Sequence, residues 1–294
     1  MKNGLLYYYS LNVQSLTQEN SKFYFNVDFD DYMLININYD EKDILHIYEL
    51  LKNIQKNKYH QIIVNNQNQI ITNIDNNKYV LLKYTNKNET IFLNDIINNN
   101  IYLDVKKYKI IDRTNWADLW SKKIDYFEYQ IQQFDNKYPL IKESIQYYIG
   151  LTENAIQYSS MINDKYITLS HKRISDNINY IDFYNPLNLI IDYKIRDTAE
   201  YFKSKFINSY LSLEEVIYYI DNILKDEQLI TFYTRMLYPS FYFDLYESII
   251  EGKTKEKELL IVIRKTNDYE KFLKNLYKHI SMKINIIIPE WLNL

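Results

Sequence analysis

The apolar residues of this chain change their spacing near residue 113, and this change constrains the fold more than any other feature. Over the first hundred residues they alternate with polar or amphipathic neighbours, as Phe23, Phe25 and Val27 do, which is typical of β-strands. From Trp116 onward they advance in steps of three and four, the spacing of an amphipathic helix. Strands followed by helices predict an α+β protein with a small sheet and a larger helical part.

The strand-rich part contains signals for five strands and one helix. Residues 22–29 and 32–37 predict a hairpin with its turn at Asp30–Asp31, and a helix is expected to begin behind Asp40, which can cap it. Three further apolar segments follow: QIIV and QIITNI, which flank an Asn-rich turn, and KYVLLKY. This order predicts a small antiparallel sheet that carries one helix.

Helical patterns dominate the rest of the chain. A helix over residues 116–134 should be ended by Pro139. The next helix contains Gly150, which costs about 1 kcal/mol relative to Ala unless the position needs a bend or close packing. Residues 165–197 contain short β-like segments. Ser212 and Glu215 have the spacing of a capping box, which predicts that another helix begins there. Several later segments also suit helices.

Composition excludes several kinds of function. The formal net charge is −3 with both signs interspersed, so no basic stripe is available for nucleic acid. The chain has no Cys, which excludes disulfides, thiol nucleophiles and thiolate zinc sites, and which suits a reducing compartment. The four His residues are far apart and lack the spacing of a metal motif, so a His-based metal site is not expected.

Neither export nor membrane insertion is expected. The N-terminus lacks a signal-peptide pattern, and no run of about 18 uncharged apolar residues occurs, so we expect a cytoplasmic protein without a membrane span. The 32 Tyr residues are interpreted as a bias toward AT-rich codons. For the aromatic segment at residues 232–246, core packing is therefore favoured over a contact surface for a partner.

Three stretches carry a resemblance to a known family. They are WADLWSKKIDYFE (116–128), YYIGLTENAIQY (147–158) and FYNPLNLIIDYKIRDTAEY (183–201). Together they resemble the YutH-type branch of the CotS-like spore coat proteins of Firmicutes, which are regarded as kinase-fold relatives of the aminoglycoside and choline phosphotransferases. The resemblance extends over about residues 113–205.

This resemblance implies a two-lobed, protein-kinase-like fold of the aminoglycoside phosphotransferase type. The small β-rich N-lobe with one helix is expected over residues 1–86. The larger helical C-lobe is expected over residues 87–294, with the β-like insert at about 165–197. Phosphoryl transfer in such a fold requires a Gly-rich loop over the phosphates, a strand Lys paired with a helix Glu, a catalytic Asp, and an Asp and an Asn for magnesium.

The phosphate-binding requirements are not met. No Gly occurs between Gly4 and Gly150, so a loop that approaches phosphates closely cannot form in the first hairpin. The strand Lys is also missing, because Ile35–Ile37 occupy the expected place. Glu41 and Glu49 therefore have no evident strand Lys as a partner.

The catalytic tripeptide is degenerate as well. Its best candidate is His171-Lys172-Arg173, in which Arg173 stands where the base should be. A guanidinium stays protonated and cannot accept the hydroxyl proton of a substrate. Asp176 or Asp182 could substitute from nearby, although turn formation is the simpler role for both.

Asp192 is the one catalytic-type group that survives. It follows an apolar run at the place of the metal-binding Asp, and Asn188 precedes it by four residues, so both are candidate metal ligands. The alternative is structural: Asp192 binds local backbone N–H groups, while Arg196 and Asp197 form a pair that clamps the insert to the next helix. We favour the structural interpretation, because a lone metal ligand without the other groups has nothing to act with.

Three hypotheses follow. The favoured one is a non-catalytic kinase-fold protein, a pseudokinase, that acts as a binding or scaffold element in sporulation. It would need no cofactor, and its partner would be a protein such as a spore coat component. The second is an atypical small-molecule phosphotransferase that uses Asp192, which would need ATP and magnesium. The third is an unrelated α+β protein.

Overall fold

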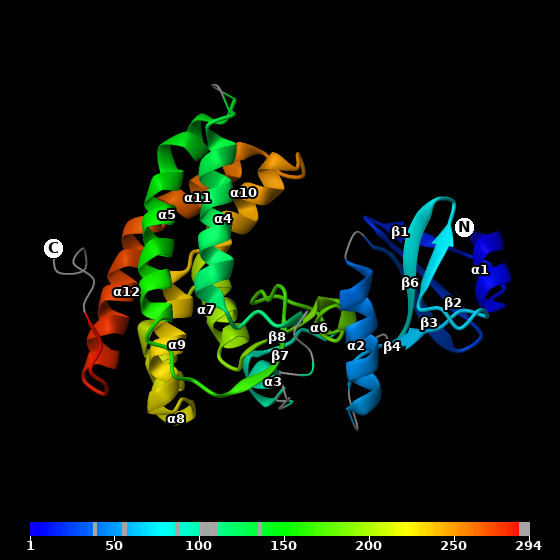
Figure 1. Ribbon diagram of the computed structural model, residues 1–294, viewed down its shortest axis with the longest axis horizontal. Helices are drawn as coiled ribbons and strands as arrows, with labels where there is room; N and C mark the ends of the chain where they lie inside the picture. Colours follow the sequence, from blue (N-terminus) through cyan, green and yellow to red (C-terminus); the bar gives the residue numbers. More distant parts are fainter. Residues whose placement is uncertain are drawn as a thin grey trace. The chain divides into compact units, whose positions relative to one another are not determined.

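The computed structural model describes residues 1–37, 40–54, 58–85, 89–99, 101, 107, 111–134 and 137–287. These residues form two compact units, which Figure 1 shows as ribbons. The described residues of 1–91, 104–112 and 177–190 make up unit 1, and those of 92–103, 113–176 and 191–294 make up unit 2. The segment Asn177–Ile190 therefore belongs to unit 1 although unit 2 surrounds it in the sequence.

Unit 1 is built on an antiparallel sheet. Its strands are β1 (Thr17–Glu19), β2 (Lys22–Val27), β3 (Asp30–Asn36), β4 (Gln61–Ile63), β5 (Ile71–Ile74) and β6 (Asn77–Tyr84). The order is β1-β2-β3-β6-β4, and β5 also pairs with β6. The predicted hairpin is confirmed, but its turn lies at residues 28–29, where Asp28 adopts a left-handed conformation with φ 56°. The segments around the Asn-rich turn do not pair with each other, because both pair with β6.

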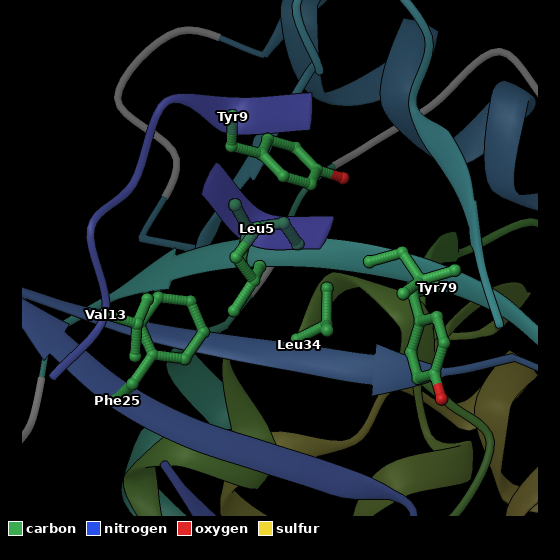
Figure 2. Packing of buried hydrophobic residues seen from close by; sticks show 8 residues of the cluster. Leu5, Tyr9, Val13, Phe25, Leu34 and Tyr79 are labelled. Carbon is green, nitrogen blue, oxygen red and sulfur yellow. The ribbon is translucent and has the colours of Figure 1, made fainter. Parts of the chain in front are cut away.

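One face of this sheet is covered by a helix that the sequence did not predict. The helix α1 (Lys2–Tyr9) buries Leu5 and Tyr9. Figure 2 shows these two side chains with Phe25 and Leu34 of the sheet, in a cluster of buried apolar residues. The hydroxyl of Tyr9 also lies 2.7 Å from the hydroxyl of Thr72 in β5, so the helix is fixed by a buried polar contact as well.

The predicted helix of unit 1 is confirmed as α2 (Glu41–Asn53). The side chain of Asp40 caps it by accepting a hydrogen bond from the backbone N–H of Lys42 at 2.9 Å. Three residues of α2 are buried at helical spacing: Ile44, Ile47 and Leu50. The short 3₁₀-helix η3 (Pro186–Asn188), from the segment that returns to unit 1, contacts α2.

Unit 2 is mainly helical. Its helices are α3 (Leu93–Asn98), α4 (Trp116–Ile131), α5 (Pro139–Ser159), α7 (Arg196–Asn208), α8 (Leu213–Ile223), α9 (Asp226–Leu237), α10 (Ser240–Ile250), α11 (Leu259–Arg264) and α12 (Thr266–Ser281). The helices α4 and α5 lie side by side (Figure 1). Pro139 begins α5 instead of ending α4, because the first turn of a helix tolerates proline. In the described part of the chain no helix is long and apolar enough to cross a membrane.

The β-like insert contains two strands that pair with each other. They are β7 (Ile167–His171) and β8 (Leu189–Tyr193), and the short helix α6 (Tyr180–Phe183) lies between them in sequence. After β8 the chain turns directly into α7, which starts at Arg196. This connection brings Asp192 and Arg196 close together.

Aromatic side chains fill the core of unit 2. Five of them in the 232–246 segment are fully buried, which confirms core packing: Phe232, Tyr233, Tyr242, Phe243 and Tyr246. Gly150 lies inside α5, and a Cβ added there would meet no atom within 4 Å. Close packing is therefore not the reason for a glycine at this position.

Candidate functional site

Asp192 lies near the end of β8 with only 1% of its surface exposed. Its Oδ1 accepts hydrogen bonds from the indole Nε1 of Trp116 at 2.9 Å and from the backbone N–H of Tyr193 at 2.8 Å. Its Oδ2 lies 3.0 Å from Nε of Arg196. Both oxygens of the predicted metal ligand are thus engaged by donors of the chain itself.

Arg196 joins the end of β7 to the start of α7. Its Nη2 donates to the carbonyl of Lys172 at 2.9 Å, and its Nη1 donates to the carbonyl of His171. The same Nη1 lies 3.3 Å from Oδ1 of Asp197, which is farther than the contact with Asp192. The guanidinium therefore holds two backbone carbonyls and two carboxylates together in a buried place.

Asp197 is engaged mainly by His171. The ring Nδ1 of His171 lies 2.6 Å from Oδ2 of Asp197, and the backbone N–H of His171 donates to both carboxylate oxygens at 3.0 and 3.2 Å. His171 is fully buried. We call the four residues Asp192, Arg196, Asp197 and His171 the clamp, because they fasten the insert to α7.

Burial governs the protonation of Asp192. It raises the pKa of this carboxyl to about 7, although the charges of Arg196 and Arg235 and the hydrogen bonds from Tyr193 and Trp116 act in the opposite direction. A carboxylate that coordinates magnesium should instead be ionised and open to the ion. In this structure Asp192 is instead buried and bonded to donors of the chain itself.

Arg173, a residue of the degenerate tripeptide, lies at the surface. Its side chain is 65% exposed, and its Nη2 lies 3.3 Å from Oδ1 of Asp244 and 3.5 Å from Oε2 of Glu247. Both acids are on α10. Lys123 of α4 also approaches Glu247, at 3.0 Å. Arg173, which the sequence predicts at the base position, is thus a cation within a surface ion network.

The sequence predictions did not include a second cluster of buried charges. Oε1 of Glu200 lies 2.6 Å from Nε of Arg235 and 2.8 Å from Nζ of Lys203, and its Oε2 accepts a hydrogen bond from Ser240 at 2.5 Å. Lys203 also donates to the carbonyls of Arg235 and Tyr238 at 2.9 and 2.8 Å. We call Glu200, Lys203, Arg235 and Ser240 the Glu200 cluster.

The Glu200 cluster and the clamp adjoin each other through aromatic rings. The guanidinium of Arg235 lies over the rings of Trp116, Trp120 and Tyr238, at 5.3 to 5.6 Å from their centres. Trp116 is the same residue that donates to Asp192. One signal in the sequence could have revealed the cluster: Arg196, Glu200 and Lys203 recur at helical spacing, so they share a face of α7.

The other sequence candidates bond with groups of their own unit. The carboxylate of Asp176 accepts hydrogen bonds from Ser204, Asn208 and Ser209 of unit 2. In unit 1, the amide of Asn188 donates to the carbonyl of Asp182 at 3.1 Å. Over the described residues, no group of three or more His, Cys, Asp or Glu is placed to hold a metal ion.

One expectation about unit 1 was wrong. Glu41 does have a lysine partner on a strand, because its carboxylate forms an ion pair with Lys78 of β6. Both side chains are about half exposed. The other helix acid, Glu49, pairs with Lys52 of its own helix at 3.3 Å.

Family comparison matches most of the chain. A family model described as "Spore coat putative kinase YutH" matches residues 2–276. The Endospore coat-associated protein YutH of Bacillus subtilis (strain 168) is 29% identical over 216 residues, which is 60% of this chain and 61% of that relative. The match thus spans about three fifths of the length of the curated relative.

Solved structures show the same fold. A spectinomycin phosphotransferase in complex with ADP and spectinomycin has 12% identity and a TM-score of 0.54, over 95% of this chain and 96% of that chain. An aminoglycoside phosphotransferase from Alicyclobacillus acidocaldarius has 8% identity and a TM-score of 0.55, over 92% and 93% of the two chains. The predicted α+β, aminoglycoside phosphotransferase-like kinase fold is confirmed. The hypothesis of an unrelated α+β protein is wrong.

Proposed function

The chain belongs to the YutH family of spore coat putative kinases, and from this premise we propose that it is a kinase-fold protein without phosphotransfer activity, which acts as a binding or scaffold element of the spore coat. The proposal rests on the state of Asp192. In a phosphotransferase of this fold that position holds magnesium against the phosphates of ATP. In this chain, donors of the protein itself contact both oxygens of Asp192 in place of a magnesium ion.

Metal binding at Asp192 would require the loss of stabilising contacts. An ion at Oδ1 would have to displace Trp116 and the N–H of Tyr193, and an ion at Oδ2 would meet the positive charge of Arg196, whose Nε lies 3.0 Å from that oxygen. Displacement of this guanidinium would also cost it the nearer of its two buried carboxylate partners. Magnesium dehydrates reluctantly and prefers an open octahedral site, so it offers little compensation.

Two further observations support the absence of catalysis. Arg173 is engaged with Asp244 and Glu247, and a guanidinium cannot accept a proton from a substrate hydroxyl. The sequence also has no Gly between Gly4 and Gly150, so no Gly-rich loop covers phosphates in unit 1. The association with the spore coat is drawn from the family description, and we propose protein components of the coat as the partners.

Thermal unfolding with and without ATP and magnesium tests the absence of catalysis. A ligand that binds only the folded state raises the melting temperature, so we expect no shift when both are added at millimolar concentration. The control is Asp192→Asn, which keeps the shape of the side chain. A shift of several degrees in the wild type that disappears in this variant would overturn the proposal and support a phosphotransferase that uses Asp192.

A further inference from the structure

Hydrogen bonds within unit 1 hold a segment that follows the degenerate tripeptide in the sequence. Within Asn177–Ile190, the carbonyl of Ile178 accepts from the backbone N–H of Ile91 at 3.0 Å. The ring Nε2 of His60 lies 2.9 Å from the carbonyl of Ile181. His60 is buried, and burial lowers its pKa, so its ring is neutral at pH 7 and adds no charge to this place.

An ion pair that is more exposed to solvent also holds this segment. Nζ of Lys22 on β2 lies 2.5 Å from Oδ1 of Asp182. The other oxygen, Oδ2, accepts a hydrogen bond from the amide of Asn179 at 3.1 Å. The side chains of Lys22 and Asp182 are 27% and 38% exposed, so solutes can reach the pair from the solvent.

The sheet register places Lys22 next to the position of the missing strand Lys. Lys22 is directly opposite Ile35 in the pairing of β2 with β3, and Ile35 is one of the residues that occupy the expected Lys position. Directly opposite residues of an antiparallel pair point to the same face of the sheet. Their neighbours Phe23 and Leu34 pack in the cluster below α1, so Lys22 and Ile35 face the other side.

We propose that Lys22 is the cation of a latent phosphate-binding site in unit 1, which the carboxylate of Asp182 fills in place of a phosphate group. The ligand class is a phosphate ester or a polyphosphate, because an ammonium on a strand binds such anions as a point charge. A carboxylate tethered by its own chain at 2.5 Å competes at high effective concentration, so a free anion binds more weakly to the wild type than to a chain without this carboxylate. This inference concerns Lys22 and does not depend on Asp192 or on the absence of catalysis.

Removal of the competing charge should open the site. In Asp182→Asn the amide keeps the shape of the side chain and leaves the ammonium of Lys22 without its anion. Binding of inorganic pyrophosphate, titrated calorimetrically at pH 7 and low salt with a chelator present, should tighten about fivefold over the wild type, the factor that corresponds to about 1 kcal/mol of ion-pair competition. The double variant that adds Lys22→Met should lose this gain.

The matched control is Glu41→Gln. It changes the net charge by the same amount and frees another strand lysine, Lys78, from its surface pair. We expect no gain in pyrophosphate affinity there. An unchanged affinity in Asp182→Asn, or a gain that persists after Lys22→Met, would overturn the proposal. If Asp182→Asn does not fold, the pyrophosphate affinity of Asp182→Ala, which also lacks the carboxylate, is measured instead, and the same outcomes support or overturn the proposal.

The metal-free condition separates this site from the proposed function. Magnesium-dependent ATP binding that disappears in Asp192→Asn would contradict the absence of catalysis and leave the Lys22 site standing. Conversely, a failure of Asp182→Asn to gain affinity would remove the Lys22 site and leave the proposal on Asp192 untouched.

Discussion

The two units use ion pairs in opposite ways. In unit 2, the clamp and the Glu200 cluster place carboxylates and cations in the core, where Asp192 and Lys203 are each 1% exposed. In unit 1, the pairs Lys22–Asp182 and Lys78–Glu41 are partly open to solvent. A buried charge that loses its partner is expensive, whereas an exposed one is solvated by water. The buried pairs of unit 2 therefore hold the structure, and the partly exposed pairs of unit 1 are free to exchange partners.

Arg196→Ala should show the largest effect, because it removes the centre of the clamp. The variant removes the nearest cation from the buried carboxylate of Asp192 and the guanidinium that donates to the carbonyls of His171 and Lys172. We expect the free energy of unfolding to fall by about 3 to 5 kcal/mol, measured by urea unfolding.

A double variant sharpens this expectation. In Asp192→Asn with Arg196→Met, no unpaired buried charge remains at this pair, so part of the lost stability should return relative to Arg196→Ala. Wild-type stability in Arg196→Ala would show that the pair does not hold the structure. That result would also reopen a ligand role for Asp192.

The sequence predicts elements better than it predicts contacts between distant segments. The periodicity of residues 22–37 and 116–131 is local, so it identifies the hairpin and the helix α4 directly. The helix α1 was missed because its buried residues Leu5 and Tyr9 lie within an unbroken run of apolar and aromatic residues that has no distinct face. Local patterns of this kind decide which element forms.

Parts of the site depend on contacts that no local pattern encodes. Lys22 and Asp182 are 160 residues apart in the sequence, and only the fold of the whole chain brings them together. The chemistry of its side chain predicted a structural role for Arg196, as a partner of Asp197. In the structure Asp192 is the nearer carboxylate to Arg196. The Glu200 cluster was missed because charged residues on a helix are normally a solvated face.

Lys203→Met should have an intermediate effect that depends on pH. Burial lowers the pKa of Lys203 to about 7, although Glu200 acts in the opposite direction. Between this value and the ordinary value of 10.5, Lys203 binds more protons in the unfolded chain than in the folded one, so it makes the wild-type free energy of unfolding rise with pH. The raised pKa of Asp192, about 7, contributes with the opposite sign, but above pH 7 this contribution is the smaller one. We expect that rise between pH 7 and 9 to be absent in the variant, with a loss of about 1 to 3 kcal/mol near pH 9.

The pH profile has a matched control on the same helix. Lys205 pairs with Glu215 at 2.7 Å near the surface, so Lys205→Met should keep the wild-type slope. The measurement is urea unfolding from pH 7 to 9, below the range in which buried tyrosines such as Tyr219 titrate, since burial raises their pKa. An unchanged slope in Lys203→Met would show that another group causes the dependence.

Lys78→Ala should show the smallest effect and so completes the comparison between the units. Its partner Glu41 is on the first turn of α2, where a carboxylate is already stabilised by the helix dipole and by water once the lysine is gone. We expect a loss of at most about 1 kcal/mol in urea unfolding, reduced further by added salt. A loss as large as that of Arg196→Ala would mean that exposure does not separate the two kinds of ion pair, and the contrast between the units would fail.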